Sequence, residues 1–359
     1  MQPRGRNQVA AIGGIVALAA VVSLSACSSN NAPAGGSSPG AAALSGTLNG
    51  SGSTFQTTFQ QAAIQQFKTV QPGMTVNYGS GGSGKGRTDL ASGVVNYAGS
   101  DSPIPSSEES NFAGKTILYF PVLIGPITLS YNLPNVNNLK LDAPVIAGIF
   151  QGNITSWNNS AITALNPGVS LPSTPITIAV RSDSSGTTQN FSLFLQTADP
   201  TDWKLGSNST ISWPHTARAG SGNSGVAQII KSTPGAIGYV DYTDAKASGL
   251  TFASVKNSSG NFIMPSSAGA SASADTVTVE PNLTFHAVWG SGAQAYPVTY
   301  QSWVLVNAKQ PNANDAKMLK AWIGYLLGPG QDLLPQLNYA KLPTGIDQKA
   351  VAQIDKITG

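Results

Sequence analysis

The stretch with the most distinctive chemistry is residues 79–86, GSGGSGKG. Its spacing nearly matches the P-loop pattern G-x-x-x-x-G-K-[ST], in which backbone N–H groups hold phosphate and the final hydroxyl binds Mg²⁺. Gly86 stands where that Ser or Thr should be. The pattern therefore indicates a loop suited to phosphate, and it leaves open whether the phosphate belongs to a nucleotide.

Other loops of the chain share this Gly, Ser and Thr composition: GSGSTF (50–55), AGSDSP (98–103) and RSDSSGTT (181–188). The first turn of a helix presents unpaired N–H groups and a partial positive charge, and Gly lets a ligand approach the backbone closely. In open α/β sheets, ligands bind beyond the carboxyl ends of the strands. One such loop is ordinarily only a helix cap. Several of them together could enclose one oxyanion.

Side chains for covalent or metal chemistry are scarce. The chain has two histidines, His215 and His286, and one cysteine, Cys27. A His/Cys metal site is therefore not expected. No G-x-S-x-G nucleophile elbow occurs, and a Ser-His-Asp triad would have to recruit a histidine that lies in no local signature. The sequence predicts neither an enzyme nor a cofactor.

Helix and strand patterns alternate along the chain, which predicts an α/β fold with a mainly parallel sheet. Apolar residues recur at helical spacing in FQTTFQQAAIQQF (55–67) and NDAKMLKAWIGYLLG (314–328). Short apolar runs such as MTVNYG, ITIAVR and GAIGYVDY predict strands. Residues 257–275, NSSGNFIMPSSAGASASAD, are polar and poor in aliphatic side chains, so we expect a surface loop there.

Two longer apolar strands are expected to cross between lobes, VLIGPITLSYN (122–132) and YPVTYQSWVLVN (296–307). They would form the hinge of a two-lobed molecule. Lobe I is then predicted to comprise residues 46–128 plus 299–359, and lobe II residues 129–298.

The N-terminus has the pattern of an export signal. Two arginines precede an apolar run that is too short for a membrane span, and Leu24-Ser25-Ala26-Cys27 resembles a bacterial lipobox. We expect residues 1–26 to be a signal peptide and Cys27 to be lipidated, with palmitate among the attached acyl chains. Residues 27–45, rich in Gly, Pro, Ala and Ser, predict a flexible tether that holds the folded part at the outer face of the cytoplasmic membrane.

The charge of the chain argues against a nucleic-acid partner. Charged residues make up only 10% of the chain, and the formal net charge is +3. Without residues 1–26, 17 Lys and Arg oppose 16 Asp and Glu. No run of Lys and Arg forms a stripe that could follow a polyanion.

Six motifs stand in the order in which phosphate-binding proteins of the PstS type carry them: GSGSTF, GSGGSGKG, GSDSP, RSDSSGTT, PGAIGYVDY and LNYAKLP. The chain resembles that family over nearly all of residues 46–345. The resemblance implies a two-lobed periplasmic-binding-protein fold of type II. It also implies a monomer that captures inorganic phosphate outside the cytoplasmic membrane and delivers it to the permease of an ABC importer.

By motif, the resemblance implies these phosphate ligands: Ser53, Thr54, Phe55, Ser83, Asp101, Arg181, Ser185, Gly186 and Thr187. Phe55 would act through its backbone while its ring lies in the core, and Asp183 would orient Arg181. The chain departs from the family at Gln56, where Pro is frequent, and at Gly84-Lys85, where another Ser is common. Lys85 is not expected to be a ligand.

Asp101 carries the selectivity expected of such a site. An ionised carboxylate only accepts hydrogen bonds and repels anions, so it suits a ligand that carries a proton. Phosphate carries one near neutral pH and sulfate does not, so Asp101 would exclude sulfate. Its loop taken alone favours an Asx-type cap before Pro103 as the role of Asp101, whereas the pattern of six motifs favours the ligand role. A phosphatase or nucleotidase on the same scaffold, or a binding protein for another tetrahedral oxyanion, are the alternative functions.

Overall fold

The computed structural model describes residues 44–359. The predicted signal peptide, the predicted lipid attachment at Cys27 and nearly all of the predicted tether lie outside the described residues. Within residues 44–359, no helix has both the length and the apolar character needed to cross a membrane.

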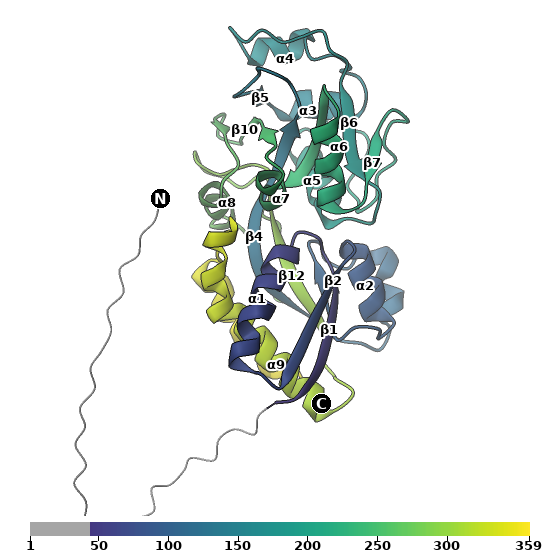
Figure 1. Cartoon of the computed structure of the whole chain (residues 1–359), viewed down its shortest axis with the longest axis vertical. Helices are drawn as coiled ribbons and strands as arrows, with labels where there is room; N and C mark the ends of the chain where they lie inside the picture. Colours follow the sequence, from purple (N-terminus) through teal and green to yellow (C-terminus); the bar gives the residue numbers. More distant parts are fainter. Residues whose placement is uncertain (1–43) are drawn as a thin grey trace, which may run out of the picture. The chain divides into compact units, whose positions relative to one another are not determined.

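The main sheet runs through the whole folded part in the order β2-β1-β3-β12-β4-β8-β6-β7, with β9 paired to β4 (Figure 1). Its strands are β1 (Gly46–Gly52), β2 (Met74–Ser80), β3 (Tyr97–Ser100), β4 (Ile117–Tyr131), β6 (Thr177–Arg181), β7 (Arg218–Gly220), β8 (Ala236–Asp241), β9 (Thr251–Phe252) and β12 (Thr299–Asn307). A small second sheet contains β5 (Lys140–Leu141), β10 (Ser254–Lys256) and β11 (Phe262–Ile263).

Helices pack against both halves of this sheet. They are α1 (Thr57–Val70), α2 (Ser83–Ala91), α3 (Ala143–Phe150), α4 (Ser160–Leu165), α5 (Gly186–Ala198), α6 (Gly222–Ser232), α7 (Tyr242–Ala247), α8 (Ser267–Ala274), α9 (Ala313–Leu327) and α10 (Thr344–Gln353). Short 3₁₀ turns are η1 (Ser106–Phe112), η2 (Pro329–Leu333), η3 (Pro335–Leu337) and η4 (Ile354–Lys356). The α/β fold class is therefore as predicted.

Two lobes are built on the two ends of the sheet. We call the part that contains β1, β2 and β3 lobe I, and the part that contains β6, β7 and β8 lobe II. The long strand β4 pairs with β12 through its first part and with β8 through its second part, so it continues from one lobe into the other. Figure 1 shows β4 and β12 between the two groups of helices. The exact lobe bounds given above stay a prediction.

The expectation of a mainly parallel sheet is only half right. β1 pairs in parallel with β2 and β3, and β6 pairs in parallel with β7 and β8. β12, however, runs antiparallel to β3 and β4, and β4 runs antiparallel to β8. The reason is connectivity, since β4 leaves lobe I and β12 returns to it, so these two strands must run in opposite directions.

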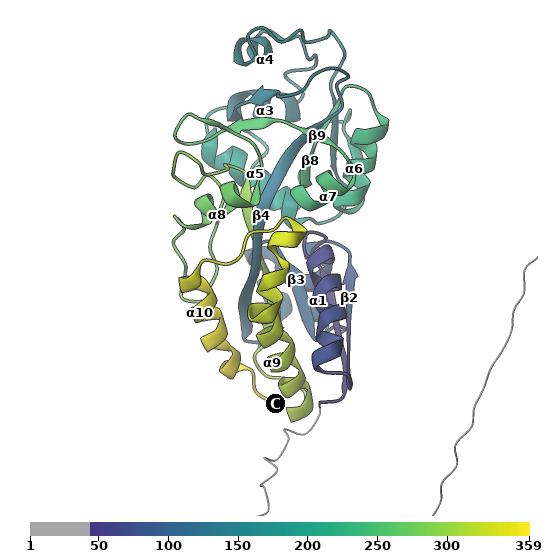
Figure 2. The same ribbon diagram turned by 60° about the vertical axis from the view of Figure 1, so that its left-hand side comes forward.

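The predicted first helix is present as α1, and its burial explains why it forms. Phe59, Ala63 and Phe67 recur every four residues and are all buried. This spacing puts them on one face of the helix. Phe67 meets Trp322 of α9 with ring centroids 5.0 Å apart. Figure 2 shows α1, α9 and α10 along the same lobe, so the C-terminal helices return to lobe I.

The prediction of a surface loop over residues 257–275 is wrong. This stretch contains β11 and the helix α8, which begins at Ser267. Ser266 is its N-cap, and the Ser266 hydroxyl accepts the N–H of Gly269 at 3.0 Å. Ala270 and Ala274 are buried on one face, and the buried Ser273 hydroxyl donates to the carbonyl of Ala287 at 2.7 Å. Small side chains let this helix approach its neighbours closely, so it needs no large aliphatic residues to be buried.

Candidate functional site

The three polar loops of lobe I meet at one edge of its sheet. They follow β1, β2 and β3, which are parallel neighbours, so their carboxyl ends lie at the same edge. Ser53 follows β1 and its N–H donates to the carbonyl of Gly99 in β3 at 2.9 Å. Ser83 is the first residue of α2, and Asp101 directly follows β3. Sheet topology therefore brings these predicted site residues together, although they are distant in the sequence.

The Asp101 carboxylate is surrounded by hydroxyl donors. Oδ1 accepts from Ser53 Oγ at 2.6 Å and from Ser302 Oγ at 2.5 Å, while Oδ2 accepts from Ser83 Oγ at 3.2 Å. Each carboxylate oxygen has about two lone-pair positions. Oδ1 is thus saturated, and Oδ2 has one position left, which is where a ligand O–H could donate.

Burial dominates the electrostatics of this carboxyl group. Only 1% of Asp101 is exposed. Burial raises the pKa of Asp101 above its ordinary value, because an ionised carboxylate loses its hydration there. The hydroxyls of Ser302 and Ser53, the charge of Arg181 and the hydroxyl of Ser83 all act in the opposite direction. The Ser donors thus offset part of the cost of keeping a charge on this buried carboxyl group.

The cation at this contact between the lobes comes from lobe II. Arg181 is the last residue of β6, and its side chain is 1% exposed. Its Nε donates to Asp183 Oδ1 at 2.8 Å, and its Nη2 donates to Asp183 Oδ2. This two-pronged pair fixes the plane of the guanidinium. Asp183 is therefore the side chain that holds the Arg181 guanidinium in place, and the role of both residues in binding a ligand stays a prediction.

The pKa of Asp183 moves the other way from that of Asp101. Burial alone would raise it, but hydrogen bonds and charge from Arg181, together with the backbone N–H of Gly222 at 3.0 Å, outweigh burial. The pKa of Asp183 is therefore lowered. Asp183 stays ionised and cancels part of the Arg181 charge.

The start of α5 forms the other half of the lobe II surface. Ser185 caps the helix, since its hydroxyl accepts the N–H of Thr188 at 3.1 Å. Gly186 and Thr187 follow in the first turn, whose N–H groups have no partner within the helix. Thr187 Oγ1 also accepts from Arg181 Nη1 at 3.3 Å. The start of α5 and the Arg181 guanidinium are thus in direct contact.

Gly186 shows how closely the lobes approach each other here. A Cβ added at Gly186 would lie 2.4 Å from Ser83 Oγ and 2.6 Å from Asp101 Oδ2. Both atoms belong to lobe I. Any side chain at position 186 would therefore clash with Ser83 and Asp101, which explains why a Gly stands there.

The remaining predicted residues come from the loop before α1. The Phe55 ring is core, as predicted, and stacks on Tyr300 at 4.0 Å between centroids. Its N–H donates to Ser53 Oγ at 3.1 Å, and the Ser53 N–H is engaged by Gly99. These two N–H groups are therefore already used within lobe I. Thr54 Oγ1 instead accepts from Asn223 Nδ2 of lobe II at 3.1 Å.

Sequence reasoning missed the polar residues that support the site from elsewhere. Ser302 and Gln301 lie on β12, and Gln301 Nε2 donates to the Asp101 carbonyl at 3.2 Å. Asn190 of α5 donates to the same carbonyl at 2.6 Å. Gln56, where the family often has Pro, donates to Ser302 Oγ at 2.7 Å. A Gln-Ser pair inside the otherwise apolar strand sequence YQSWVLV was the available signal.

The near-P-loop is not a nucleotide site in this fold. A Cβ at Gly86 would lie 2.7 Å from Gly52 Cα and 2.8 Å from Ser51 O, so the Mg²⁺-binding hydroxyl of a P-loop has no room. Lys85 bonds Asp89 at 2.6 Å on the surface of α2. The Gly84 N–H donates to the Ser184 carbonyl of lobe II at 3.0 Å. This loop faces lobe II, whereas the Lys85 ammonium group pairs with Asp89 of its own helix.

Two lobes share crossover strands, and helix starts, hydroxyls and the Arg181 guanidinium meet where the lobes contact each other. This arrangement is typical of a solute-binding protein. Residues 37–329 match the family model described as a PBP superfamily domain. The phosphate-binding protein PstS 3 of Mycobacterium leprae is 34% identical over 309 residues, 83% of this chain and 83% of that protein. The phosphate-binding protein PstS of Pasteurella multocida is 32% identical over 86% of this chain and 89% of that protein.

Among solved structures, a high affinity periplasmic phosphate-binding protein (PfluDING) bound with phosphate superposes with a TM-score of 0.71 at 21% identity, covering 86% of this chain and 94% of that one. At this identity the likeness concerns the fold. The chain belongs to the PBP superfamily and, within it, to the PstS phosphate-binding proteins.

Proposed function

We propose that this protein captures inorganic phosphate outside the cytoplasmic membrane and delivers it to the permease of an ABC importer. The observation that carries the proposal is that Asp101 of lobe I and Arg181 of lobe II lie close enough for the charge of Arg181 to act on the Asp101 carboxyl and oppose the rise of its pKa. Arg181 and the start of α5 supply positive potential for an anion. Asp101 Oδ2 keeps one acceptor position, which suits an anion that still carries a proton.

Selectivity follows from the same pair. A protonated phosphate oxygen donates to Asp101, whereas fully ionised sulfate would meet an unpaired acceptor and a like charge in a buried site. The ligands proposed from the sequence are Ser53, Thr54, Phe55, Ser83, Asp101, Arg181, Ser185, Gly186 and Thr187. The geometry favours Thr54, Arg181, Gly186 and Thr187 as donors. Ser53 and Ser83 act at least partly through Asp101, because their hydroxyls donate to it.

We further propose that the protein works as a monomer, without cofactor and without catalysis, tethered by lipid on Cys27 at the outer face of the membrane. Support comes from the lipobox in the sequence and from relatives that are named as binding proteins. The mass of the N-terminal peptide from membrane-extracted protein tests the lipid, since an unmodified Cys27 would contradict it.

Calorimetric titration of the purified folded part tests the binding function. Phosphate should bind with a dissociation constant of about 1 μM or lower, equivalent to roughly −8 kcal/mol. Sulfate at the same concentrations should give no heat of binding. Equal binding of phosphate and sulfate, or no binding of phosphate, would overturn the proposal.

A further inference from the structure

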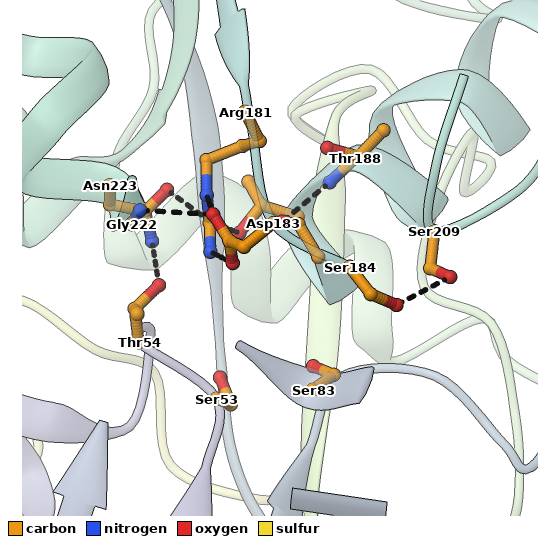
Figure 3. A network of polar contacts seen from close by, with 12 residues as sticks. Ser53, Thr54, Ser83, Arg181, Asp183, Ser184, Thr188, Ser209, Gly222 and Asn223 are labelled. Carbon is orange, nitrogen blue, oxygen red and sulfur yellow. Dashed lines mark hydrogen bonds and ion pairs between the residues drawn. The ribbon is translucent and has the colours of Figure 1, made fainter. Parts of the chain in front are cut away.

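Asn223 joins the two halves of the site directly. It lies in the first turn of α6, within the loop SGNSG that motif reasoning passed over. The side chain is fully buried, with 0% exposed. Its Oδ1 accepts from Arg181 Nη1 at 3.3 Å, and its Nδ2 donates to Thr54 Oγ1 at 3.1 Å. Figure 3 shows the chain of contacts from Thr54 through Asn223 to Arg181.

The loop geometry holds Asn223 in this place. Gly222 has a φ of +67°, a conformation that favours Gly, and its N–H donates to Asp183 Oδ1 at 3.0 Å. A Cβ at Gly222 would lie 3.3 Å from Thr54 Cγ2, so the start of α6 is seated against lobe I. Asp183 therefore anchors both the guanidinium and the residue before Asn223.

The contact to Thr54 decides where its hydroxyl proton can point. Because Asn223 donates to the Thr54 oxygen, the single hydroxyl hydrogen of Thr54 remains free to donate elsewhere. An anion bound where the lobes meet would accept this hydrogen. An acceptor at position 223 would instead draw that hydrogen away from the ligand.

The contact of Asn223 with Arg181 leaves one N–H group of the guanidinium without a partner in the described part of the chain. A guanidinium has five N–H groups. Asp183 takes one from Nε and one from Nη2, while Asn223 and Thr187 both contact Nη1. One N–H of Nη2 is then available to a ligand. Asn223 supplies a neutral acceptor, so it orients the guanidinium without cancelling its charge further.

We propose that Asn223 is a positioning residue that couples lobe closure to the orientation of Thr54 and Arg181 toward phosphate. It acts through these two groups rather than on the ligand. This inference rests on the proposed phosphate-binding function. Since the Thr54–Asn223 bond spans the lobes, losing it should speed release of phosphate more than it slows capture.

The test compares Asn223→Ala and Asn223→Asp with the parent by phosphate titration and stopped-flow release. Asn223→Ala should weaken binding about 10- to 50-fold, because two hydrogen bonds are lost and one involves a charged group. The release rate should rise by most of that factor. Asn223→Asp should bind still more weakly, because the carboxylate repels the anion and takes the Thr54 proton.

Two further variants separate positioning from folding. Asn166→Ala is the matched control, because Asn166 is also buried in lobe II and bonds only backbone groups of Lys140 and Ile162. It should lower the melting temperature and leave the phosphate affinity within about twofold of the parent. In a Thr54→Val background, Asn223→Ala should cost clearly less than in the parent, since their shared bond is already lost.

The outcomes distinguish this inference from the proposed function. A parent protein that does not bind phosphate defeats the proposed function. A parent that binds, combined with Asn223→Ala that binds equally well, or with effects of Thr54→Val and Asn223→Ala that simply add, overturns only the role of Asn223.

Discussion

Asp101 and Asp183 are the same residue type on opposite sides of the contact between the two lobes, and their surroundings shift their pKa values in opposite directions. Asp101 of lobe I is held by three serine hydroxyls, and burial raises its pKa. Asp183 of lobe II is held by a guanidinium, and its pKa is lowered. Neutral donors only partly replace the hydration of a buried carboxylate, whereas a paired cation more than replaces it.

This difference suggests that the two lobes contribute different properties to the proposed site. In the proposed site, lobe II would attract the anion through Arg181 and the start of α5, while Asp183 orients the guanidinium and cancels part of its charge. Lobe I would discriminate between anions, because the buried Asp101 acceptor favours a ligand that can donate a proton. An anion site built from lobe II alone would bind any oxyanion. The following predictions remove the charged residues of one lobe at a time.

The largest effect should come from removing the cation. Arg181→Gln should weaken phosphate binding by about 10²- to 10³-fold, because charge-assisted hydrogen bonds are lost and the partly exposed Asp183 loses its partner. Calorimetry measures this directly. Arg218→Gln is the control, since Arg218 lies on the neighbouring strand β7, is exposed and bonds Thr233. A loss below tenfold in Arg181→Gln would remove Arg181 from the ligand shell.

Removing the Asp101 charge of lobe I should change the selectivity for phosphate over sulfate more than the affinity for phosphate. In Asp101→Asn the acceptor that meets the ligand proton becomes an amide, which can also donate and carries no charge. Phosphate should bind about 10- to 100-fold more weakly, while sulfate binding should become measurable. Asp183→Asn should weaken both anions together. An unchanged phosphate-to-sulfate ratio in Asp101→Asn would mean that Asp101 does not touch the ligand.

The sequence alone was sufficient to predict the loops of the candidate site. It was insufficient to predict the residues from other elements that support these loops. Ser83, Asp101 and Arg181 follow strand patterns, so their convergence follows from ordinary sheet geometry. Ser302 and Asn223 enter the site from the hinge strand β12 and from α6, through contacts between residues far apart in the chain. Such contacts depend on how the lobes pack, which no local spacing encodes. The helix α8 was missed for a related reason, because tertiary packing of small residues overrides their weak apolar pattern.

The smallest effect, and the most direct test of the comparison, is on stability against pH. Because the folded pKa of Asp101 is raised, the folded state holds its proton longer than the unfolded chain, and stability falls as the pH rises above the ordinary value of 3.8. Asp101→Asn should therefore gain stability relative to the parent as the pH rises above 3.8, in phosphate-free buffer.

Asp183 should behave in the opposite way. Its folded pKa is lowered, so its contribution is present above 3.8 and is lost as the pH falls through the lower folded value. Asp183→Asn should cost about 1–2 kcal/mol at neutral pH, discounted from a fully buried pair because Asp183 is partly exposed. That cost should shrink in acid. Urea unfolding of both variants between pH 3 and pH 7 (about the range in which carboxyl groups titrate) measures the two slopes. Parallel curves for the two variants would show that the carboxylates share one environment, because only opposite surroundings make removal of the same charge act with opposite sign.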